Sequence, residues 1–281
     1  MRTSEYVVLT FFAWTSLLAV TLSIETQVRT TALAANVLVF LMYFGLSRMR
    51  HFPWTGLLRD WIPQALLILA YKQMGWFATR THTYRFEQSW VVWDRIILND
   101  WHGRAIVESL GVLLPSLLEL SYVLVYALPP ATMAIVYLLK LRQRADTMLT
   151  ICLLGLLLCY AQFPFWPSEP PRAVFPGQDM PTFQTPIRVF SLWIVGNYGI
   201  HTSVFPSAHV SGAVAAALGM AHLVPRRRLL VSAYFAYAAL VAIATIYGRY
   251  HYTVDAIAGI AVGCIALPLG TWLSSQGERH S

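Results

Sequence analysis

The stretch F-P-S-A-H-V-S-G-A-V-A-A, from Phe205 to Ala216, passes within a few residues from a loop into an apolar helix. Pro206 suits the first turn of a helix, and Ser207 can cap that helix or donate its hydroxyl to an anion. His209 therefore lies at the point where an apolar segment begins. A histidine at such a border often only hydrogen-bonds at an interface, so its role depends on the rest of the chain.

The composition of the chain predicts a membrane protein. Of its 281 residues, 57% are hydrophobic and 12% are charged, whereas soluble domains carry about 25% charged residues. Roughly 20 apolar residues cross a bilayer as a helix, and several segments reach about that length. We therefore expect an all-α, polytopic membrane helical bundle. The net charge of +7 follows from membrane topology and does not indicate nucleic acid as a partner.

Eight apolar segments are predicted to span the membrane. The first segment is too long for a signal peptide and lacks a cleavage site, so we interpret it as a retained span. The three cysteines lie inside apolar segments and are expected to be core residues. The eight predicted spans are residues 6–24, 31–46, 62–78, 112–139, 147–163, 208–224, 229–247 and 252–273.

Clusters of basic residues predict the orientation of these spans. They occur at residues 48–59, 140–144 and 226–228, after the second, fourth and sixth spans. Because these loops alternate, they share one side, which the positive-inside rule assigns to the cytoplasm together with both termini. The opposite side holds residues 79–111, expected to form an interfacial helix, and residues 164–207. This second segment is rich in proline and is expected to have little regular structure.

The sixth and eighth spans both begin at the external side, so two helix N-termini face one place. Such termini offer free N–H groups to an anion. His251 and Asp255, spaced i, i+4, share a helix face, and Asp255 could orient the ring of His251 as a nucleophile. His209 could then protonate a leaving oxygen. The His251–Asp255 pair also fits a structural capping bond or a pair of metal ligands.

Two charged residues lie inside predicted spans. Lys72 and Glu119 are at compatible depths, so we expect them to pair and to line the site. The alternative for Lys72 is that its side chain reaches to the headgroups. Gly259 and Gly263 form a G-x-x-x-G pattern, which predicts that the eighth span packs closely against the slim sixth span.

The histidine segments resemble the type-2 phosphatidic acid phosphatase superfamily, which also contains vanadium haloperoxidases. Its members carry P-S-G-H at one helix start and S-R-x5-H-x3-D at another, with K-x6-R-P upstream. Here the first motif is P-S-A-H, ending at His209. The second keeps His251 and Asp255 but has Ala244 and Thr245 in place of Ser-Arg, and the third is absent in its standard form.

Two further stretches resemble one branch of that superfamily, the inositol phosphorylceramide synthase and sphingomyelin synthase group with its bacterial relatives. They are I-Y-G-R-Y-H-Y-T-V-D-A-I-A-G (246–259) and P-F-W-P-S-E-P-P-R (164–172). The similarity covers roughly residues 61–271. It implies a six-span catalytic membrane domain, residues 61–281, after two N-terminal spans in residues 1–60. It also implies a bacterial plasma membrane with the site on its external face.

The resemblance implies a mechanism without a metal or an organic cofactor. His251 would attack phosphorus and form a phosphohistidine, Asp255 would orient it, and His209 would protonate the departing oxygen. The missing arginine of the family motif leaves phosphate binding to other groups. Arg172 and Arg249, together with Ser207, are the candidates, because a guanidinium matches phosphate in a bidentate fashion. Arg249 could instead be an anchor at headgroup level.

Three functions follow as hypotheses. Hydrolysis of a lipid phosphate would make the protein a lipid phosphatase, which is the function we predict. Transfer of the phospho-headgroup to a lipid alcohol uses the same histidine chemistry and is the alternative. A transporter or haem protein with His209 and His251 as ligands is the third, although no inverted repeat is visible. The expected partners are a lipid phosphate substrate and membrane lipids, while the oligomeric state stays open.

Overall fold

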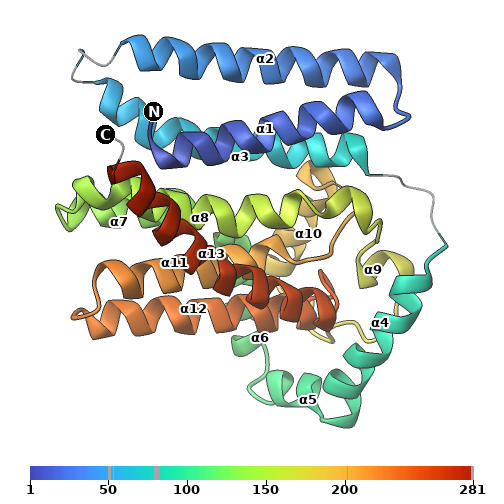
Figure 1. The fold of residues 1–281 in the computed structure, drawn as a ribbon. Coiled ribbons are helices and arrows are strands. Elements are labelled where there is room, and N and C mark those ends of the chain that lie inside the picture. The colour runs from blue at the N-terminus through green and yellow to red at the C-terminus, as the bar shows by residue number, and fades with distance from the viewer. Residues whose placement is uncertain (50–51, 53, 79–82, 201, 280–281) are drawn as a thin grey trace.

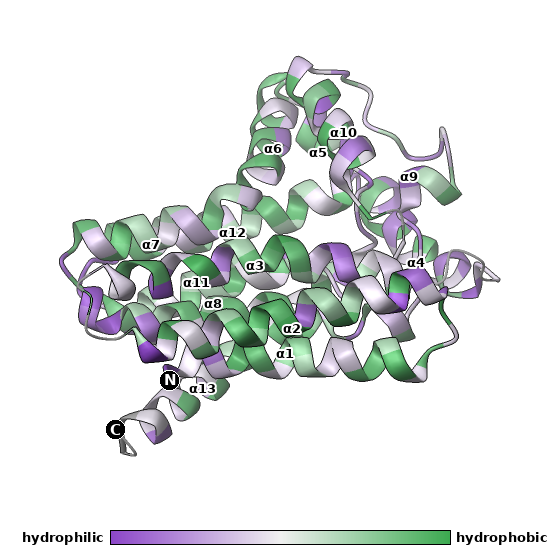
Figure 2. Cartoon of the chain, turned by 90° about the horizontal axis from the view of Figure 1, so that it is seen from above, coloured by the Kyte–Doolittle hydropathy of each residue, from purple (hydrophilic) through white to green (hydrophobic). Residues whose placement is uncertain are grey.

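A computed structural model describes residues 1–49, 52, 54–78, 83–200 and 202–279 of the chain. Within these residues it contains helices and no strand, which confirms the all-α prediction. Most of the long helices run side by side along one direction, and α13 crosses them diagonally (Figure 1). Hydrophobic residues follow the helices, and hydrophilic residues concentrate towards the loops at their ends (Figure 2).

Each of the eight predicted spans contains a helix. Six helical stretches are long and apolar enough to cross a membrane, so the chain is an integral membrane protein. The remaining two predicted spans correspond to α3 and to α11, a shorter apolar helix. The helices are α1 (Thr3–Thr21), α2 (Thr26–Arg48), α3 (Thr55–Phe77), α6 (Leu113–Leu124) continued through η2 (Val125–Ala127) into α7 (Leu128–Leu138), α8 (Ala145–Tyr160) preceded by η3 (Arg142–Arg144), α11 (Ala208–Leu223), α12 (Arg228–Tyr247) and α13 (Thr253–Arg279).

Helix α11 packs against α8, α12 and α13 and forms the centre of the bundle. Glycines permit this close approach, as the G-x-x-x-G pattern predicted. A Cβ atom on Gly259 would lie 2.5 Å from the carbonyl oxygen of Ser207, and one on Gly155 would lie 2.5 Å from the Cβ atom of Ala215. The starts of α11 and α13 are therefore adjacent, which brings their N-terminal residues together.

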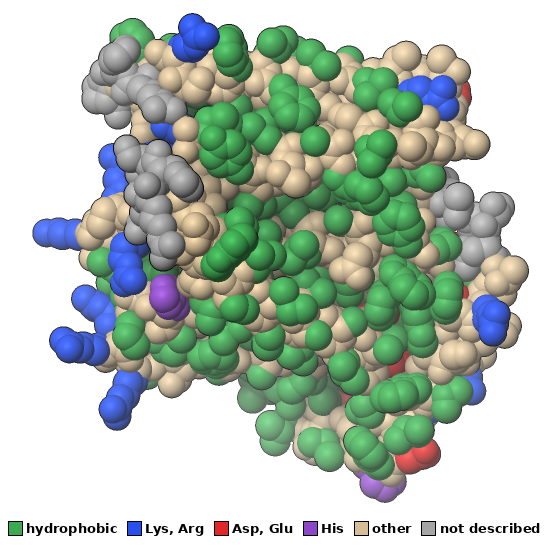
Figure 3. Space-filling model, in the orientation of Figure 1, with side chains coloured by type: hydrophobic (Ala, Val, Ile, Leu, Met, Phe, Trp, Pro, Cys, Tyr) green, Lys and Arg blue, Asp and Glu red, His purple; other side chains and the backbone are tan. Residues whose placement is uncertain are grey.

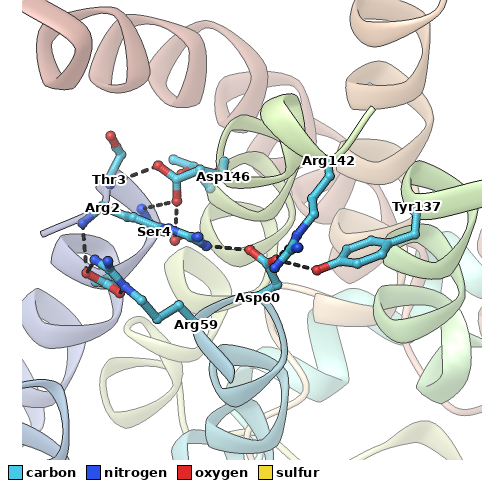
Figure 4. Close-up of polar contacts among 10 residues, drawn as sticks. Arg2, Thr3, Ser4, Arg59, Asp60, Tyr137, Arg142 and Asp146 are labelled. Carbon is cyan, nitrogen blue, oxygen red and sulfur yellow. Dashed lines mark hydrogen bonds and ion pairs between the residues drawn. The ribbon is translucent and has the colours of Figure 1, made fainter. Parts of the chain in front are cut away.

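A polar network fastens the N-terminal helices to the rest of the bundle (Figure 4). Asp146, at the start of α8, accepts hydrogen bonds from the backbone N–H groups of Thr3 and Ser4, at 3.0 and 3.2 Å, and thereby caps α1. Asp60 of α3 is the second centre of the network. Asp60 accepts hydrogen bonds from Arg2, Tyr137 and Arg142. Next to it, Arg59 of α3 forms an ion pair with Glu5 of α1.

The two chain ends lie at the same end of the bundle, since a Cβ atom on Gly277 would lie 2.7 Å from the Oγ1 atom of Thr3. Lysine and arginine side chains gather at this end of the molecule, on the left of Figure 3, and are fewer at the other. Arg144 of this end donates to the carbonyl oxygen of Leu223, the last residue of α11, at 2.8 Å. His209, near the start of the same helix, therefore faces the opposite end.

That opposite end is covered by the two long outer segments. In the first, α4 (Arg85–Arg95) continues through a π-helical turn, η1 (Ile96–Asp100), to α5 (Gly103–Glu108), so the expected helix is present; residues 79–82 lie outside the described residues. In the second, the expectation of little regular structure is wrong. Besides the short η4 (Phe163–Phe165) and α9 (Pro171–Val174), it contains the 13-residue helix α10 (Pro186–Tyr198).

The reason for α10 is local. Its one proline, Pro186, begins the helix and does not interrupt it, because Pro186 occupies the first helical position, where a missing N–H costs nothing. The side chain of Thr185 accepts a hydrogen bond from the backbone N–H of Arg188 at 3.1 Å and caps the helix. A T-P pair followed by apolar residues was a helix-start signal that the abundance of proline concealed.

Candidate active site

The two predicted histidines meet at the starts of α11 and α13. The Nδ1 atom of His209 lies 3.1 Å from the Nε2 atom of His251. His209 follows the N-cap residue Ser207, whose Oγ atom accepts from the backbone N–H of Val210 at 3.4 Å. The backbone N–H of Ser207 in turn donates to the carbonyl oxygen of Asp255 at 3.0 Å. A backbone hydrogen bond thus joins the starts of α11 and α13.

One hydrogen bond on the far side of the His251 ring, to the carbonyl oxygen of Val204, fixes its tautomer. Its Nδ1 atom lies 3.0 Å from the carbonyl oxygen of Val204 and 3.4 Å from the Oδ2 atom of Asp255. A carbonyl oxygen can only accept, so Nδ1 carries the proton and Nε2 carries the lone pair. Asp255 thus lies where the sequence placed it, but the shorter contact is with Val204, a backbone group that no side-chain pattern reveals. The lone pair of Nε2 points towards His209.

The electrostatic environment keeps this ring neutral. His251 is only 5% exposed. Burial, with a smaller contribution from the positive charge of Arg172, lowers the pKa of His251 to about 3. At neutral pH the ring is therefore uncharged, as a nitrogen nucleophile must be.

Both predicted arginines lie beside the histidine loop. The Cζ atom of Arg172 is 5.2 Å from the centre of the Tyr250 ring, and its backbone N–H donates to the carbonyl oxygen of Arg249 at 3.3 Å. Arg249 precedes α13, has a left-handed φ of 62°, and is fully buried. Its Nη1 atom lies 2.6 Å from the Oδ2 atom of Asp94, so Arg249 is not an anchor exposed at headgroup level.

A third arginine, Arg188 of α10, was missed by sequence reasoning. Its Nη1 atom lies 2.6 Å from Oε1 of Glu119 and 3.3 Å from the carbonyl oxygen of Gly248, while the hydroxyl of Tyr250 donates to Oε2 of Glu119 at 2.7 Å. The predicted pair of Lys72 with Glu119 is therefore wrong. Lys72 instead donates to the carbonyl oxygen of Tyr198 at 2.7 Å, because α10, which was not expected to be a helix, supplies a partner for each of them.

The guanidinium groups of Arg188 and Arg249 share an unusual feature. Both are buried, and within the described part of the chain the Nε and Nη2 atoms of each have no hydrogen-bond partner. Buried donors of this kind are normally satisfied. The Nε and Nη2 edge of a guanidinium is a fork that matches two oxygens of a phosphate. Each arginine thus uses one nitrogen for its carboxylate and leaves such a fork open.

Two tyrosine rings lie close to the ring of His209. The ring of Tyr122 is 5.0 Å from that of His209 and stacks on Tyr250 at 3.8 Å, while Tyr126 meets His209 edge-on at 5.3 Å. Tyr126 is 48% exposed, so its ring reaches from His209 to the surface of the bundle. Tyr122 of α6 and Tyr126 of η2 are four residues apart, a spacing that the sequence contained but that nothing in it tied to His209.

No group of three His, Cys, Asp or Glu side chains in the described residues is arranged to hold a metal ion. A sequence model of the PAP2 superfamily matches residues 89–269. The chain belongs to the PAP2 superfamily. Members of this superfamily are generally phosphatases or phosphotransferases, so a phosphatase-type lipid phosphoesterase or a related activity is supported. No curated protein and no solved structure matches the chain significantly.

The region that matches the PAP2 superfamily begins within α4 and ends within α13. It includes both histidines, Asp255 and the three arginines, and it excludes α1, α2 and α3. The division into residues 1–60 and 61–281, and the closer resemblance to the inositol phosphorylceramide synthase group, stay predictions.

Proposed function

We propose that this PAP2 protein is an integral-membrane lipid phosphatase that hydrolyses a lipid phosphate ester through a phosphohistidine on His251. The observation that carries the proposal is the pairing of His251 Nε2, neutral and with its lone pair directed inwards, with His209 at 3.1 Å. A nucleophile and an acid within hydrogen-bond reach of each other are the parts that phosphoryl transfer to a histidine needs.

The reaction would take place in two steps. Nε2 of His251 attacks phosphorus as the bond from phosphorus to the lipid oxygen breaks, and His209, in the imidazolium form that the negative charge of the bound phosphate favours, gives one proton to that oxygen. Water then attacks phosphorus, His209 takes a proton from the water, and the phosphorus–nitrogen bond breaks to release phosphate. The two rings must part when substrate binds, because the lone pair that attacks phosphorus lies against His209 in this structure. Asp255 and the carbonyl of Val204 hold the Nδ1–H side during both steps.

Phosphate binding would use donors from several segments. Ser207 and the N-terminus of α11 lie next to His209 and suit an anion. Arg172, whose positive charge acts on His251, is the first candidate cation. The open forks of Arg249 and Arg188 supply further donors. These residues would replace the arginine that the superfamily motif has at the position of Thr245.

The alternative is a lipid phosphotransferase of the inositol phosphorylceramide synthase type. Besides the sequence resemblance, one observation favours it. His251 is 5% exposed, and its partner His209 lies against the rings of Tyr122 and Tyr126, so an alcohol delivered from the membrane could reach the phosphohistidine more readily than bulk water. Transfer would then replace the hydrolytic second step. The positive-inside distribution supports an external site and cytoplasmic termini in either case.

The test is phosphate release from phosphatidic acid, polyprenyl pyrophosphate and sphingoid phosphates by the purified protein. His251→Ala should abolish release, and His222→Ala, at the exposed far end of α11, should not. If the folded wild type releases no phosphate, a phospholipid donor with ceramide or diacylglycerol is offered next. Headgroup exchange that depends on His251 would establish the alternative, and the absence of both reactions would refute the proposal.

A further inference from the structure

Helix α4 presents one face to the protein and another outwards. Glu87, Val91 and Asp94 are buried, at the i, i+4 and i+7 positions that define a single helix face. Val92 and Trp93 on the other side are exposed. Acidic side chains on the inner face of a short helix are costly to bury unless they have specific partners.

The partners of this inner face belong to the three segments that build the candidate site. Glu87 accepts from the backbone N–H of Glu169 at 3.0 Å, in the proline-rich stretch that leads to Arg172. Trp90 stacks on Phe205 at 5.2 Å, in the loop before His209, and packs edge-on against Tyr252 at 5.7 Å. One helix therefore supports all three segments.

Asp94 makes the most specific of these contacts. Its Oδ2 atom accepts from Nη1 of Arg249 at 2.6 Å, and its Oδ1 atom accepts from both the backbone N–H and the hydroxyl of Thr253, at 2.7 and 2.8 Å. Arg249 and Thr253 lie two residues before and two residues after His251. The carboxylate therefore holds the loop that carries His251 on both sides.

The backbone of this loop needs such support. Arg249 has a φ of 62°, a left-handed conformation that is unfavourable for a residue with a side chain unless its surroundings impose it. Thr253 is the first residue of α13, where a free N–H group has no partner within its own helix. Asp94 satisfies that N–H group and fixes the side chain of the left-handed residue.

We propose that Asp94 is a positioning residue for His251, which it holds against His209 by binding Arg249 and Thr253 without touching the substrate itself. The inference rests on the proposed role of His251 as the nucleophile. A displacement of about 1 Å in a reacting group can lower the rate about 100-fold. Loss of this carboxylate should therefore lower kcat much more than it changes KM.

The test compares Asp94→Asn with Asp100→Asn, the same substitution at an exposed position six residues further along the same segment. The asparagine retains an oxygen for Thr253 but turns an NH2 group towards the guanidinium of Arg249. We expect kcat to fall about 100-fold with KM within about threefold of wild type, and Asp94→Glu to recover part of kcat. An unchanged kcat, an equal loss in Asp100→Asn, or a change confined to KM would overturn the inference.

A second readout does not depend on activity. Hydrogen exchange of the peptide spanning residues 249–255 should accelerate in Asp94→Ala, while exchange in the middle of α13 stays at the wild-type rate. Thr253→Val, which removes one of the three bonds, serves if Asp94→Ala does not fold, and should give a smaller acceleration in the same peptide. Unchanged exchange there would refute the positioning role. If instead wild type lacks activity on every substrate, the proposed function fails, while the exchange data still decide what Asp94 holds.

Discussion

Glu119→Ala tests the buried ion pair that distinguishes the structure from the sequence prediction. The Glu119 carboxylate and the Arg188 guanidinium are 2% and 1% exposed and lie 2.6 Å apart. Removing the carboxylate leaves a buried cation without its counter-ion and the hydroxyl of Tyr250 without its acceptor. The same change leaves Lys72 with its partner, the carbonyl oxygen of Tyr198.

The expected loss of stability is large. Two unit charges about 4 Å apart interact by about 4 kcal/mol at an effective dielectric constant of about 20. Breaking a buried pair by removing one partner typically costs 3–5 kcal/mol, since the remaining charge stays buried. The unpaired hydroxyl adds to this, though not additively. We therefore expect Glu119→Ala to lower the free energy of unfolding by about 3–5 kcal/mol.

Double-mutant cycles on the protein in detergent measure the coupling energy of the Glu119–Arg188 pair and that of the Glu119–Lys72 pair predicted from sequence. Glu119→Ala and Arg188→Met, alone and combined, should give a coupling energy of about 2 kcal/mol or more, because the double variant buries no unpaired charge. The matched cycle of Glu119→Ala with Lys72→Met should give a coupling near zero. Coupling to Lys72 in place of Arg188 would refute the arrangement at this site and restore the pair predicted from sequence.

Two further outcomes follow from the packing and the ionisation of the site. Gly259→Ala should lower both stability and activity, because its Cβ atom would lie 2.5 Å from the carbonyl oxygen of Ser207 and would push α13 away from α11. The control is Gly45→Ala, whose Cβ atom would have no neighbour within 4 Å. In thermal unfolding this control should be neutral or stabilising. The pKa of His251 is about 3 in the folded state and about 6.5 when unfolded. Between these values the unfolded state binds more protons, so stability falls as the pH is lowered. The glutamine of His251→Gln does not titrate, so the melting temperature of this variant should decrease less between pH 7 and pH 4 than that of the wild type. An equal decrease in both proteins would contradict a neutral, buried His251 ring.

The spans were predictable because their signal is local. About 20 apolar residues in a row cross a bilayer whatever they pack against, and each predicted span contains a helix. The meeting of His209 and His251 was predictable for a related reason. Once the number of spans is known, alternation of direction places the starts of the sixth and eighth at one face. Glycines at 259 and 263 indicated that these two helices touch.

The contacts that support the histidines were not predictable in the same way. Asp94 and Arg188 come from the outer segments, 157 and 63 residues before His251 in the chain (251 − 94 and 251 − 188). Neither has a spacing that relates it to the histidine loop. Lys72 and Glu119 were paired from membrane depth alone, and depth does not say which neighbour lies on the same side of a helix. The carbonyl of Val204 could not be found at all, because every residue has one.

The departure from the superfamily motif acquires a physical meaning from these contacts. At the position where the motif has arginine, Thr245 is buried and its hydroxyl donates to the carbonyl oxygen of Ala242 within α12. The proposed phosphate-binding cations come instead from the outer segments and the loop before α13. Arg188 and Arg249 each face a buried carboxylate, whereas Arg172 forms no ion pair with any described residue. Two of the three arginines therefore offer directional N–H groups with their charge already balanced, and Arg172 brings the uncompensated positive charge. Under the proposed function, recognition of phosphate would depend on where these donors point as much as on charge. Glu119 and Asp94, which hold two of the donors, would then matter to the chemistry without reaching the reacting atoms.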